Sequence, residues 1–246
     1  MIALRFCALV PTYDNPLTIG PVVDRIREHL AEVLVVDDGS ADAGRRAVEA
    51  LAATGRAHVH RLEQNLGKGG AVKVGFRVAR ELGFTHAFQI DADGQHDVTE
   101  IPRFLVAASE QPDALVLGVP VFDETAPAGR LRGRLISRFW TDLETGGRVI
   151  EDPLCGFRVY PLDAALRANA RANRMEFDPE IAVRMIWNGC RVVNLRTRVR
   201  YLSPAEGGVS HFRMFRDNVL ISLCHARLFI TAVFRVLTLR RLRRRE

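Results

Sequence analysis

Two aspartates one residue apart follow a short apolar segment in the middle of the chain. The segment Phe88-Gln-Ile runs into Asp91-Ala-Asp93, and an amide side chain follows at Gln95. A strand that ends on this pattern delivers its carboxylates to the carboxyl edge of a sheet, where α/β proteins bind ligands. Oxygen ligands of this kind suit Mg²⁺ or Mn²⁺ and leave coordination positions for substrate phosphates. The alternative is a turn in which Asp only caps the following backbone.

Strand-like and helix-like segments alternate before and after this pattern. The expected strands of the first part occupy residues 3–10, 33–36, 58–62 and 88–90. Such alternation on short loops predicts an α/β fold, with a mostly parallel sheet and helices on both faces. Because Tyr13, Asp38, Lys68 and Asp91 each follow a strand, we expect them at one edge of the sheet, where a nucleotide could bind.

A glycine-rich segment, Asn65-Leu-Gly-Lys-Gly-Gly70, precedes the third expected helix. Its glycines would let the backbone approach a ligand, and Lys68 could contact a phosphate. The spacing is neither that of a Walker loop nor that of the dinucleotide-binding Gly-x-Gly-x-x-Gly pattern. A simple helix-entry turn is the other interpretation.

Four motifs in this order and spacing resemble family 2 glycosyltransferases, especially the polyprenyl-phosphate (dolichyl-phosphate) mannose or glucose synthases. The motifs are Val10-Pro-Thr-Tyr13, Val35-Val-Asp-Asp-Gly-Ser40, Asn65-Leu-Gly-Lys-Gly69 and Asp91-Ala-Asp-Gly-Gln-His96. The resemblance covers roughly residues 5–215 and implies a GT-A fold with a Rossmann-like sheet. It divides a catalytic domain, residues 1–215, into a nucleotide-sugar half at about 1–120 and an acceptor half at about 121–215.

The same resemblance implies roles for individual residues. The metal, Mg²⁺ or Mn²⁺, would be held by Asp91, Asp93 and Gln95. The UDP- or GDP-linked sugar would be bound by Pro11, Thr12, Tyr13, Asp14, Asp37, Asp38, Lys68, Asp91, Ala92, His211 and Arg213. Two departures stand out: the family often has Asn-Glu where Asp14-Asn15 stands, and His211 replaces the usual Lys of a glycine-rich loop.

Motifs of the second half resemble the junction of donor and acceptor sites. Asp152-Pro-Leu-Cys-Gly-Phe-Arg158 resembles a family signature, and Asp178 stands where many members place a catalytic carboxylate. Acids in a first helical turn also serve the helix dipole alone. The candidate catalytic residues are Asp178 as base, with Glu180 and Asp152 behind it, and Arg134 and Arg158.

Composition predicts a mobile loop over the site at Asp123–Arg134, which is rich in Pro, Gly, Ala and Arg. Arg134 could close over a diphosphate, because a guanidinium group suits phosphoryl oxygens, or it could be solvated surface. Residues 193–201 alternate apolar and basic side chains and predict a strand with one wet face.

Residues 216–246 predict a C-terminal apolar or amphipathic helix with an arginine-rich tail. His225, Arg227 and Arg235 interrupt its apolar run, so the uncharged pieces are far shorter than the ~20 residues of a membrane span. We therefore expect peripheral association with a membrane rather than a crossing helix. An oligomer helix is possible as well; a nucleic-acid tail is the alternative, although we expect no nucleic-acid partner.

Composition places the chain among ordinary globular proteins, with 48% hydrophobic residues and a net charge of +6 over 246 residues. Four scattered cysteines indicate free thiols in a reducing compartment, and the first residues do not resemble a secretory signal. We expect a cytoplasmic protein on the inner face of the cell membrane.

The resemblance implies an inverting transferase that moves a hexose from a nucleotide-diphosphate sugar to a lipid-linked acceptor. A hydroxyl acceptor would need Asp178 as general base, whereas a polyprenyl phosphate is already anionic and would not. Alternatives are a sugar-phosphate nucleotidyltransferase and a non-catalytic nucleotide-binding or membrane-scaffold protein. The first would carry a Gly-rich, Arg-containing signature after the first strand, where Pro11-Thr-Tyr-Asp-Asn15 stands instead.

Overall fold

The computed structural model describes residues 3–122, 128–200 and 212–243. The strands are β1 (Phe6–Thr12), β2 (Val33–Asp37), β3 (His58–Arg61), β4 (His86–Gln89), β5 (Ala114–Phe122), β6 (Arg158–Pro161) and β7 (Arg191–Val199). The helices are α1 (Ile19–Arg27), α2 (Asp42–Ala53), α3 (Lys68–Glu81), α4 (Ile101–Glu110), α5 (Ala128–Thr145), α6 (Leu162–Ala168), α7 (Phe177–Trp187) and α8 (Met214–Arg243), with a short 3-10 helix at Val98–Glu100.

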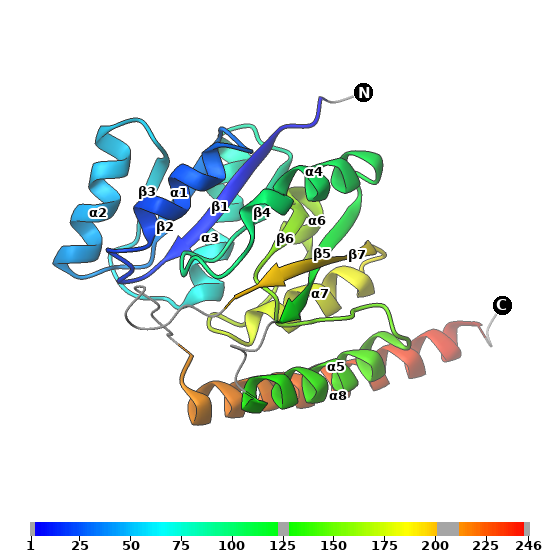
Figure 1. The fold of residues 1–246 in the computed structure, drawn as a ribbon. Coiled ribbons are helices and arrows are strands. Elements are labelled where there is room, and N and C mark those ends of the chain that lie inside the picture. The colour runs from blue at the N-terminus through cyan, green and yellow to red at the C-terminus, as the bar shows by residue number, and fades with distance from the viewer. Residues whose placement is uncertain (1–2, 123–127, 201–211, 244–246) are drawn as a thin grey trace.

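The described strands form one sheet in the order β3-β2-β1-β4-β6-β5-β7 (Figure 1). Only β6 runs antiparallel to its neighbours β4 and β5; the other pairs are parallel. The predicted mostly parallel sheet is thereby confirmed. The order runs 3-2-1 in one direction and turns to β4 in the other, so the loops after β1 and β4 diverge. A crevice at such a switch point is the usual ligand site of this architecture.

Both faces of the sheet are covered by helices, which explains why its strands read as continuous apolar runs. Along β1, Cys7 and Leu9 pack with residues of α3, α6 and α7, whereas Ala8 and Val10 pack with residues of α1, α2 and α4. Successive side chains of a strand point to opposite faces, so each face acquires its own core. This packing holds the carboxyl ends of β1 and β4 rigidly.

A helix replaces most of the loop that the sequence predicts over Asp123–Arg134. Helix α5 begins at Ala128, so the loop prediction is wrong for residues 128–134; residues 123–127 lie outside the described part. Gly129 and Gly133 lower the helix propensity by about 1 kcal/mol each. Packing of α5 against α8 and α7 outweighs this penalty.

Helices α5 and α8 lie side by side beneath the rest of the molecule (Figure 1). On α5 the buried side chains are polar, at Ser137, Thr141 and Glu144, and large apolar side chains such as Leu135 and Phe139 are exposed. The spacing of 137, 141 and 144 places the three polar groups on one helical face. Helix α5 is therefore polar on its buried side, whereas α8 buries His225 together with apolar side chains such as Cys224 and Leu228. The exposed, outer side of the pair is apolar.

Helix α8 occupies most of the segment for which the sequence predicts a C-terminal helix, residues 216–246. The stretch Met214–Thr238 meets the length and composition of a membrane span, with a mean hydropathy of 1.7 in its most apolar window, of which 28% is buried. Length and composition alone do not test the predicted peripheral association. His225 is buried, Arg227 pairs with Glu180, and Arg235 donates to the Trp187 carbonyl, so all three interruptions face the protein.

Candidate active site

A cavity of about 630 Å³ opens at the carboxyl ends of β1 and β4, where the strand order reverses. Its size suits a drug-sized or nucleotide-sized ligand. Of the residues predicted from the sequence, it is lined by Pro11, Thr12, Tyr13, Asp38, Lys68, Asp91, Ala92, Asp93, Gln95, Arg134, Asp178 and Arg213. Residues that lie up to about 200 positions apart in the chain thus share one wall.

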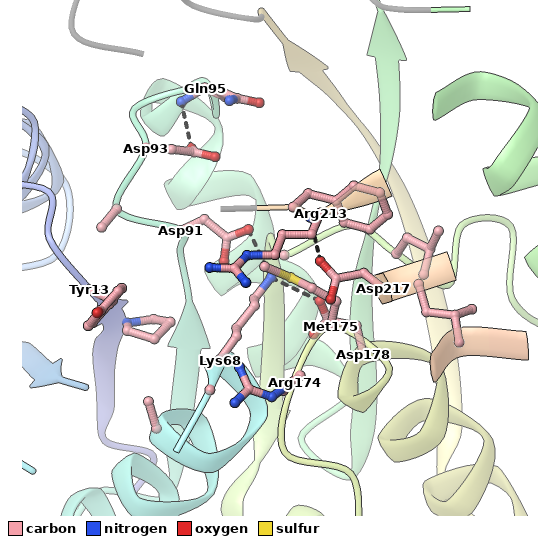
Figure 2. A pocket seen from close by; sticks show the side chains of 18 of the residues that line it. Tyr13, Lys68, Asp91, Asp93, Gln95, Arg174, Met175, Asp178, Arg213 and Asp217 are labelled. Atoms are coloured by element: carbon pink, nitrogen blue, oxygen red, sulfur yellow. Dashed lines mark hydrogen bonds and ion pairs between the residues drawn. The ribbon is translucent and has the colours of Figure 1, made fainter. Parts of the chain in front are cut away.

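Lys68 joins two carboxylates at the centre of this cavity (Figure 2). Its Nζ lies 2.9 Å from Oδ2 of Asp91 and 2.9 Å from Oδ2 of Asp178. Burial opposes the charge on Lys68, but the two carboxylates outweigh it and raise the pKa of the ammonium group. Burial likewise opposes ionisation of Asp91, yet Lys68 and His96 lower the pKa of that carboxyl overall. Lys68 and Asp91 therefore form a charged pair at neutral pH.

The position of Lys68 depends on the glycine before it. Gly67 caps α3 with a φ of +91°, and a Cβ there would lie 2.5 Å from the Asn173 carbonyl oxygen. Only glycine combines this backbone angle with so close an approach. The same Asn173 carbonyl accepts a hydrogen bond from Gly70 N at 2.9 Å. The glycine-rich segment is thus a helix-entry turn that also directs Lys68 into the cavity. The helix-entry and ligand-contact interpretations of the motif are therefore compatible.

The predicted metal ligands offer hard oxygen atoms of the right type. Oδ1 of Asp91 is buried and, among the residues described, has no hydrogen-bond partner, while Oδ1 of Asp93 accepts from Gln95 N at 3.1 Å. A Cβ on Gly156 would lie 2.1 Å from Oδ2 of Asp91, so glycine makes room for this carboxylate. The described part of the chain holds no preformed cluster of three His, Cys, Asp or Glu ligands. These side chains fit Mg²⁺ or Mn²⁺ only if substrate oxygens complete the shell.

Asp38 serves the loop as well as the cavity. Its two carboxylate oxygens accept hydrogen bonds from Leu66 N at 2.7 Å and Gly67 N at 2.8 Å. Burial raises the pKa of Asp38, although these backbone donors act in the opposite direction. The acid after β2 therefore fastens the glycine-rich segment to the sheet edge and leaves its remaining lone pairs toward the cavity.

Two predicted donor-binding acids do not line the cavity. Asp14 has a φ of +48° and accepts from Ala41 N at 2.7 Å, and Asp37 accepts from Ser40 N at 3.0 Å and pairs with Arg61. Both shape the loops that follow β1 and β2. His211 lies outside the described residues.

Two predicted catalytic residues, Asp152 and Arg158, likewise stand behind the cavity wall. Asp152 is paired with Arg134, one guanidinium nitrogen of which lies 2.6 and 2.7 Å from its two oxygens. Arg158 is fully buried and donates to the carbonyl oxygens of Cys155, Pro153 and Asp178. These contacts position Arg134 and Asp178, which do face the cavity.

Glu180 is also buried away from the cavity. It accepts hydrogen bonds from Ala172 N at 2.6 Å and from Arg184 Nε at 2.8 Å, and it pairs with Arg227 of α8 at 2.9 Å. With both oxygens engaged, it holds the segment before α7, α7 itself and α8 together. Its place is structural, two residues beyond Asp178.

Other cavity residues were not anticipated. His96 is buried beside Asp91, and burial lowers its pKa to about 4, so it is neutral at physiological pH. Arg174 and Met175 enter from the segment before α7, and Asp217 and Asn218 enter from α8. His96 belongs to the Asp91 motif and could have been included. The α8 residues had no signal in the sequence, because only the docking of α8 brings them to the cavity.

Comparisons with known proteins agree with this architecture. The family model described as "Glycosyl transferase family 2" matches residues 7–167. Glycosyltransferase AglJ of Haloferax volcanii is 28% identical, over 88% of this chain and 69% of its own length. The undecaprenyl-phosphate mannosyltransferase of Micrococcus luteus is 33% identical, over 67% and 69%, and the polyprenol monophosphomannose synthase of Mycolicibacterium smegmatis 30%, over 78% and 76%.

A solved structure shares the fold across most of the chain. It is glucosyl-3-phosphoglycerate synthase from Mycobacterium tuberculosis in complex with Mn²⁺ and UDP-glucose, with a TM-score of 0.63 and 20% identity. The match covers 91% of this chain and 79% of that chain. At this identity the likeness establishes the fold, which confirms the predicted GT-A architecture.

Proposed function

Because the chain belongs to glycosyltransferase family 2 and is a transferase, we propose that it moves a hexose from a UDP- or GDP-linked sugar to a polyprenyl phosphate, with inversion at the anomeric carbon. The observation that carries this proposal is the cluster of Lys68, Asp91 and Asp178 in a cavity at the switch point of the sheet. The names of the relatives from Micrococcus luteus and Mycolicibacterium smegmatis support the class of acceptor.

The donor would lie along the ends of β1, β2 and β4. Tyr13 and Asp38 would face its nucleoside, and Asp91, Asp93 and Gln95 would hold Mg²⁺ or Mn²⁺ against its diphosphate. When bound, the metal would supply positive charge to the departing diphosphate. Lys68 and Arg213 add fixed positive charge on the same wall, where exclusion of water makes it more effective.

Asp178 fits an acceptor that brings its own negative charge. Its carboxylate is nearly buried and is neutralised by the Lys68 ammonium group at 2.9 Å. The Asp178 carboxylate is already engaged by Lys68, and an anionic phosphate nucleophile needs no general base. We therefore assign Asp178 to holding Lys68, and the general base that a hydroxyl acceptor would require is unnecessary.

The outer side of the α5–α8 pair would rest on the membrane that carries the acceptor. Its large apolar side chains are exposed; Leu135, Phe215 and Phe234 are 66%, 86% and 65% accessible. An apolar patch of this extent marks an interaction surface, and lipid suits a helical face that presents large apolar side chains. The cavity opens beside the helix pair, since Arg134 of α5 and Asn218 of α8 line the cavity.

We place the protein on the cytoplasmic face of that membrane. Cys7, Cys155, Cys190 and Cys224 are free thiols, which fits a reducing compartment. The alternative to membrane binding is a homo-oligomer in which a second copy of the chain covers the same outer side. The two differ in their dependence on vesicles: a dimer forms without lipid, whereas membrane binding requires it.

The proposal is tested first by donor binding and then by transfer. Thermal shift and calorimetry with UDP and GDP, each with and without Mn²⁺, should reveal metal-dependent binding, because a ligand of the folded state raises its melting temperature. Transfer of labelled hexose to undecaprenyl phosphate in vesicles should follow with one donor of a UDP- and GDP-sugar panel. Binding without any transfer would contradict the proposed reaction.

Asp93→Asn should remove the Mn²⁺-dependent part of donor binding without lowering the melting temperature of the free protein. The carboxylate projects into the cavity, so the amide would cost the fold little but would lose the charge that attracts the metal. Asp97→Asn, which changes a cap of the following helical turn outside the cavity, is the control. If Asp93→Asn responds fully to Mn²⁺, Asp93 is not a ligand.

A further inference from the structure

Three buried polar side chains form a continuous chain between α5 and α8. The Ser137 hydroxyl lies 2.6 Å from Nε2 of His225, and Nδ1 of the same ring lies 2.9 Å from Oε1 of Glu144. Each of the three residues is at most 3% exposed. The His225 ring also lies parallel to Trp140, with centroids 6.5 Å apart. A histidine from one helix is thus held between two groups of the other.

The geometry resembles a serine–histidine–carboxylate triad, but it has no access to a substrate. None of the three residues is among those that line the described cavities, and Oε2 of Glu144 is buried without a hydrogen-bond partner in the described part. Burial raises the pKa of Glu144, against the effect of His225. A nucleophilic serine needs a site for the reacting carbonyl group, which is missing here. We therefore infer that these hydrogen bonds fix the arrangement of α5 and α8.

Such a cluster costs more than an apolar contact of the same size unless its geometry is specific. Replacing buried polar groups with well-packed apolar side chains is often neutral or stabilising, so we attribute the cluster to the specification of one helix arrangement. Here only one axial register of α8 brings His225 opposite both Ser137 and Glu144. The Arg227–Glu180 pair fixes the same helix against α7, at 2.9 Å.

The register of α8 decides the composition of the cavity wall. Arg134 stands one helical turn before Ser137 on α5, and Asp217, Asn218 and Ile221 stand one to two turns before His225 on α8. The two helices are close at this end: a Cβ added to Gly133 of α5 would lie 3.9 Å from Oδ1 of Asn218 of α8. A slip of α8 would therefore displace this wall while leaving the sheet edge in place.

We propose that His225 is a positioning residue, which holds α8 in the register that sets Arg134 and the first turns of α8 around the acceptor's phosphate. This inference rests on the proposed transfer to a polyprenyl phosphate and deepens it. Apart from Arg213, which directly precedes α8, the donor side is built from the ends of β1, β2 and β4 and from Lys68, which do not depend on this contact. Loss of the register should thus affect the acceptor far more than the donor.

The test compares His225→Leu with the triple variant Ser137→Ala/Glu144→Leu/His225→Leu. The single variant leaves Glu144 buried without its partner and should melt at lower temperature. The triple variant replaces the whole chain by apolar groups and should regain the wild-type melting temperature. Both should raise the KM for undecaprenyl phosphate in phosphatidylglycerol vesicles by about tenfold to a hundredfold, as a misplacement of about 1 Å does. Calorimetric Kd values for UDP or GDP with Mn²⁺ should change far less.

Hydrogen exchange provides a readout that does not need the reaction. Backbone amides at 214–221 should exchange faster in both variants, whereas those at 86–96 should not change. Thr231→Ala removes one side-chain hydrogen bond to the Arg227 carbonyl on the same helix and serves as the control. A stable triple variant with wild-type KM and wild-type exchange overturns the proposal. If the wild type transfers no sugar at all, the proposed function fails, and the exchange measurement alone decides the role of His225.

Discussion

The sheet and helix α5 bury opposite kinds of side chain. Strand β2 is buried at every position and, apart from Asp37, consists of Val and Leu, as is usual for a parallel strand between two layers of helices. In α5 the buried face holds Ser137, Thr141 and Glu144, and Leu135 and Phe139 are exposed. The same chain thus follows two rules of burial, which is understandable if water surrounds the sheet domain and an apolar phase meets the outer side of the pair.

The two regions also have different proposed roles in the site, donor binding and acceptor binding. The sheet edge carries groups fixed by a rigid core, such as Asp38 and Asp91, and would bind a water-soluble donor. The helix pair contributes Arg134 and the first turns of α8, and its outer side would meet the phase that contains a lipid acceptor. The cavity lies where these two regions join.

The largest effect is expected from a substitution in the charged cluster of Lys68, Asp91 and Asp178, in the cavity between the sheet edge and the helix pair. Lys68→Met should reduce kcat/KM by about 10²-fold or more, because the developing diphosphate loses a preorganised charge. It should also destabilise the protein by about 3–5 kcal/mol, since Asp91 and Asp178 would remain buried without their cation. Initial rates and urea unfolding measure the two effects.

Lys73→Met is the matched control for that change. Lys73 lies on the same helix but reaches carbonyl oxygens of residues 170 and 171 and Asn173 Oδ1 outside the cavity. It should retain most of the activity. Equal losses of kcat/KM in both variants would show that Lys68 matters only for folding.

Replacing one phenylalanine in each region by alanine tests the contrast between the sheet core and the outer side of the helix pair most directly. Phe104→Ala removes a fully buried ring of the sheet core and should cost about 3–5 kcal/mol of unfolding free energy, with no effect on lipid binding. Phe139→Ala removes a ring that is 58% exposed on α5 and should leave stability nearly unchanged. It should weaken binding to anionic vesicles, because a buried aromatic side chain contributes about 1.5–3 kcal/mol.

Urea unfolding and vesicle sedimentation of the two variants decide this prediction. The assignment of the outer side to lipid would be wrong if Phe139→Ala sediments with vesicles like the wild type. A change in dimerisation without lipid would instead identify the outer side as a contact between copies of the chain.

The smallest expected effect is an opposite pH dependence of the two regions. Burial lowers the pKa of His86 in β4 below its usual 6.5, so the folded state binds fewer protons than the unfolded chain and stability is lost as pH falls from 6.5 through the lowered pKa. Burial raises the pKa of Glu144 above its usual 4.5, so the folded state binds more protons and stability falls as pH rises from 4.5 through the raised pKa.

Melting curves of His86→Gln and Glu144→Gln against pH measure these contributions by difference from the wild type. Each substitution should flatten the profile only in its own window. Identical profiles for all three proteins would mean that neither burial shifts a pKa enough to matter.

How far the site could be predicted depends on where each residue stands relative to a strand. Tyr13, Asp38, Lys68 and Asp91 follow strands, so the rules of parallel sheets bring them together without any knowledge of side-chain packing. Arg158 and Glu180 belong to equally clear motifs, yet they lie behind the wall and hold Asp178 and α8 in place. A motif identifies residues that matter but does not distinguish contact with a ligand from support.

By itself, the sequence determined the α/β architecture, the order of its elements and the acidic and glycine-rich segments at one sheet edge, because period-2 and period-3.6 patterns and short connections are local properties of the chain. Only the tertiary structure decided that α5 is a helix, that Arg227 and Arg235 of α8 contact α7, and that Asp217 and Asn218 reach the cavity. These features depend on contacts between α5 and α8, about 80 residues apart, for which no local pattern carries a signal.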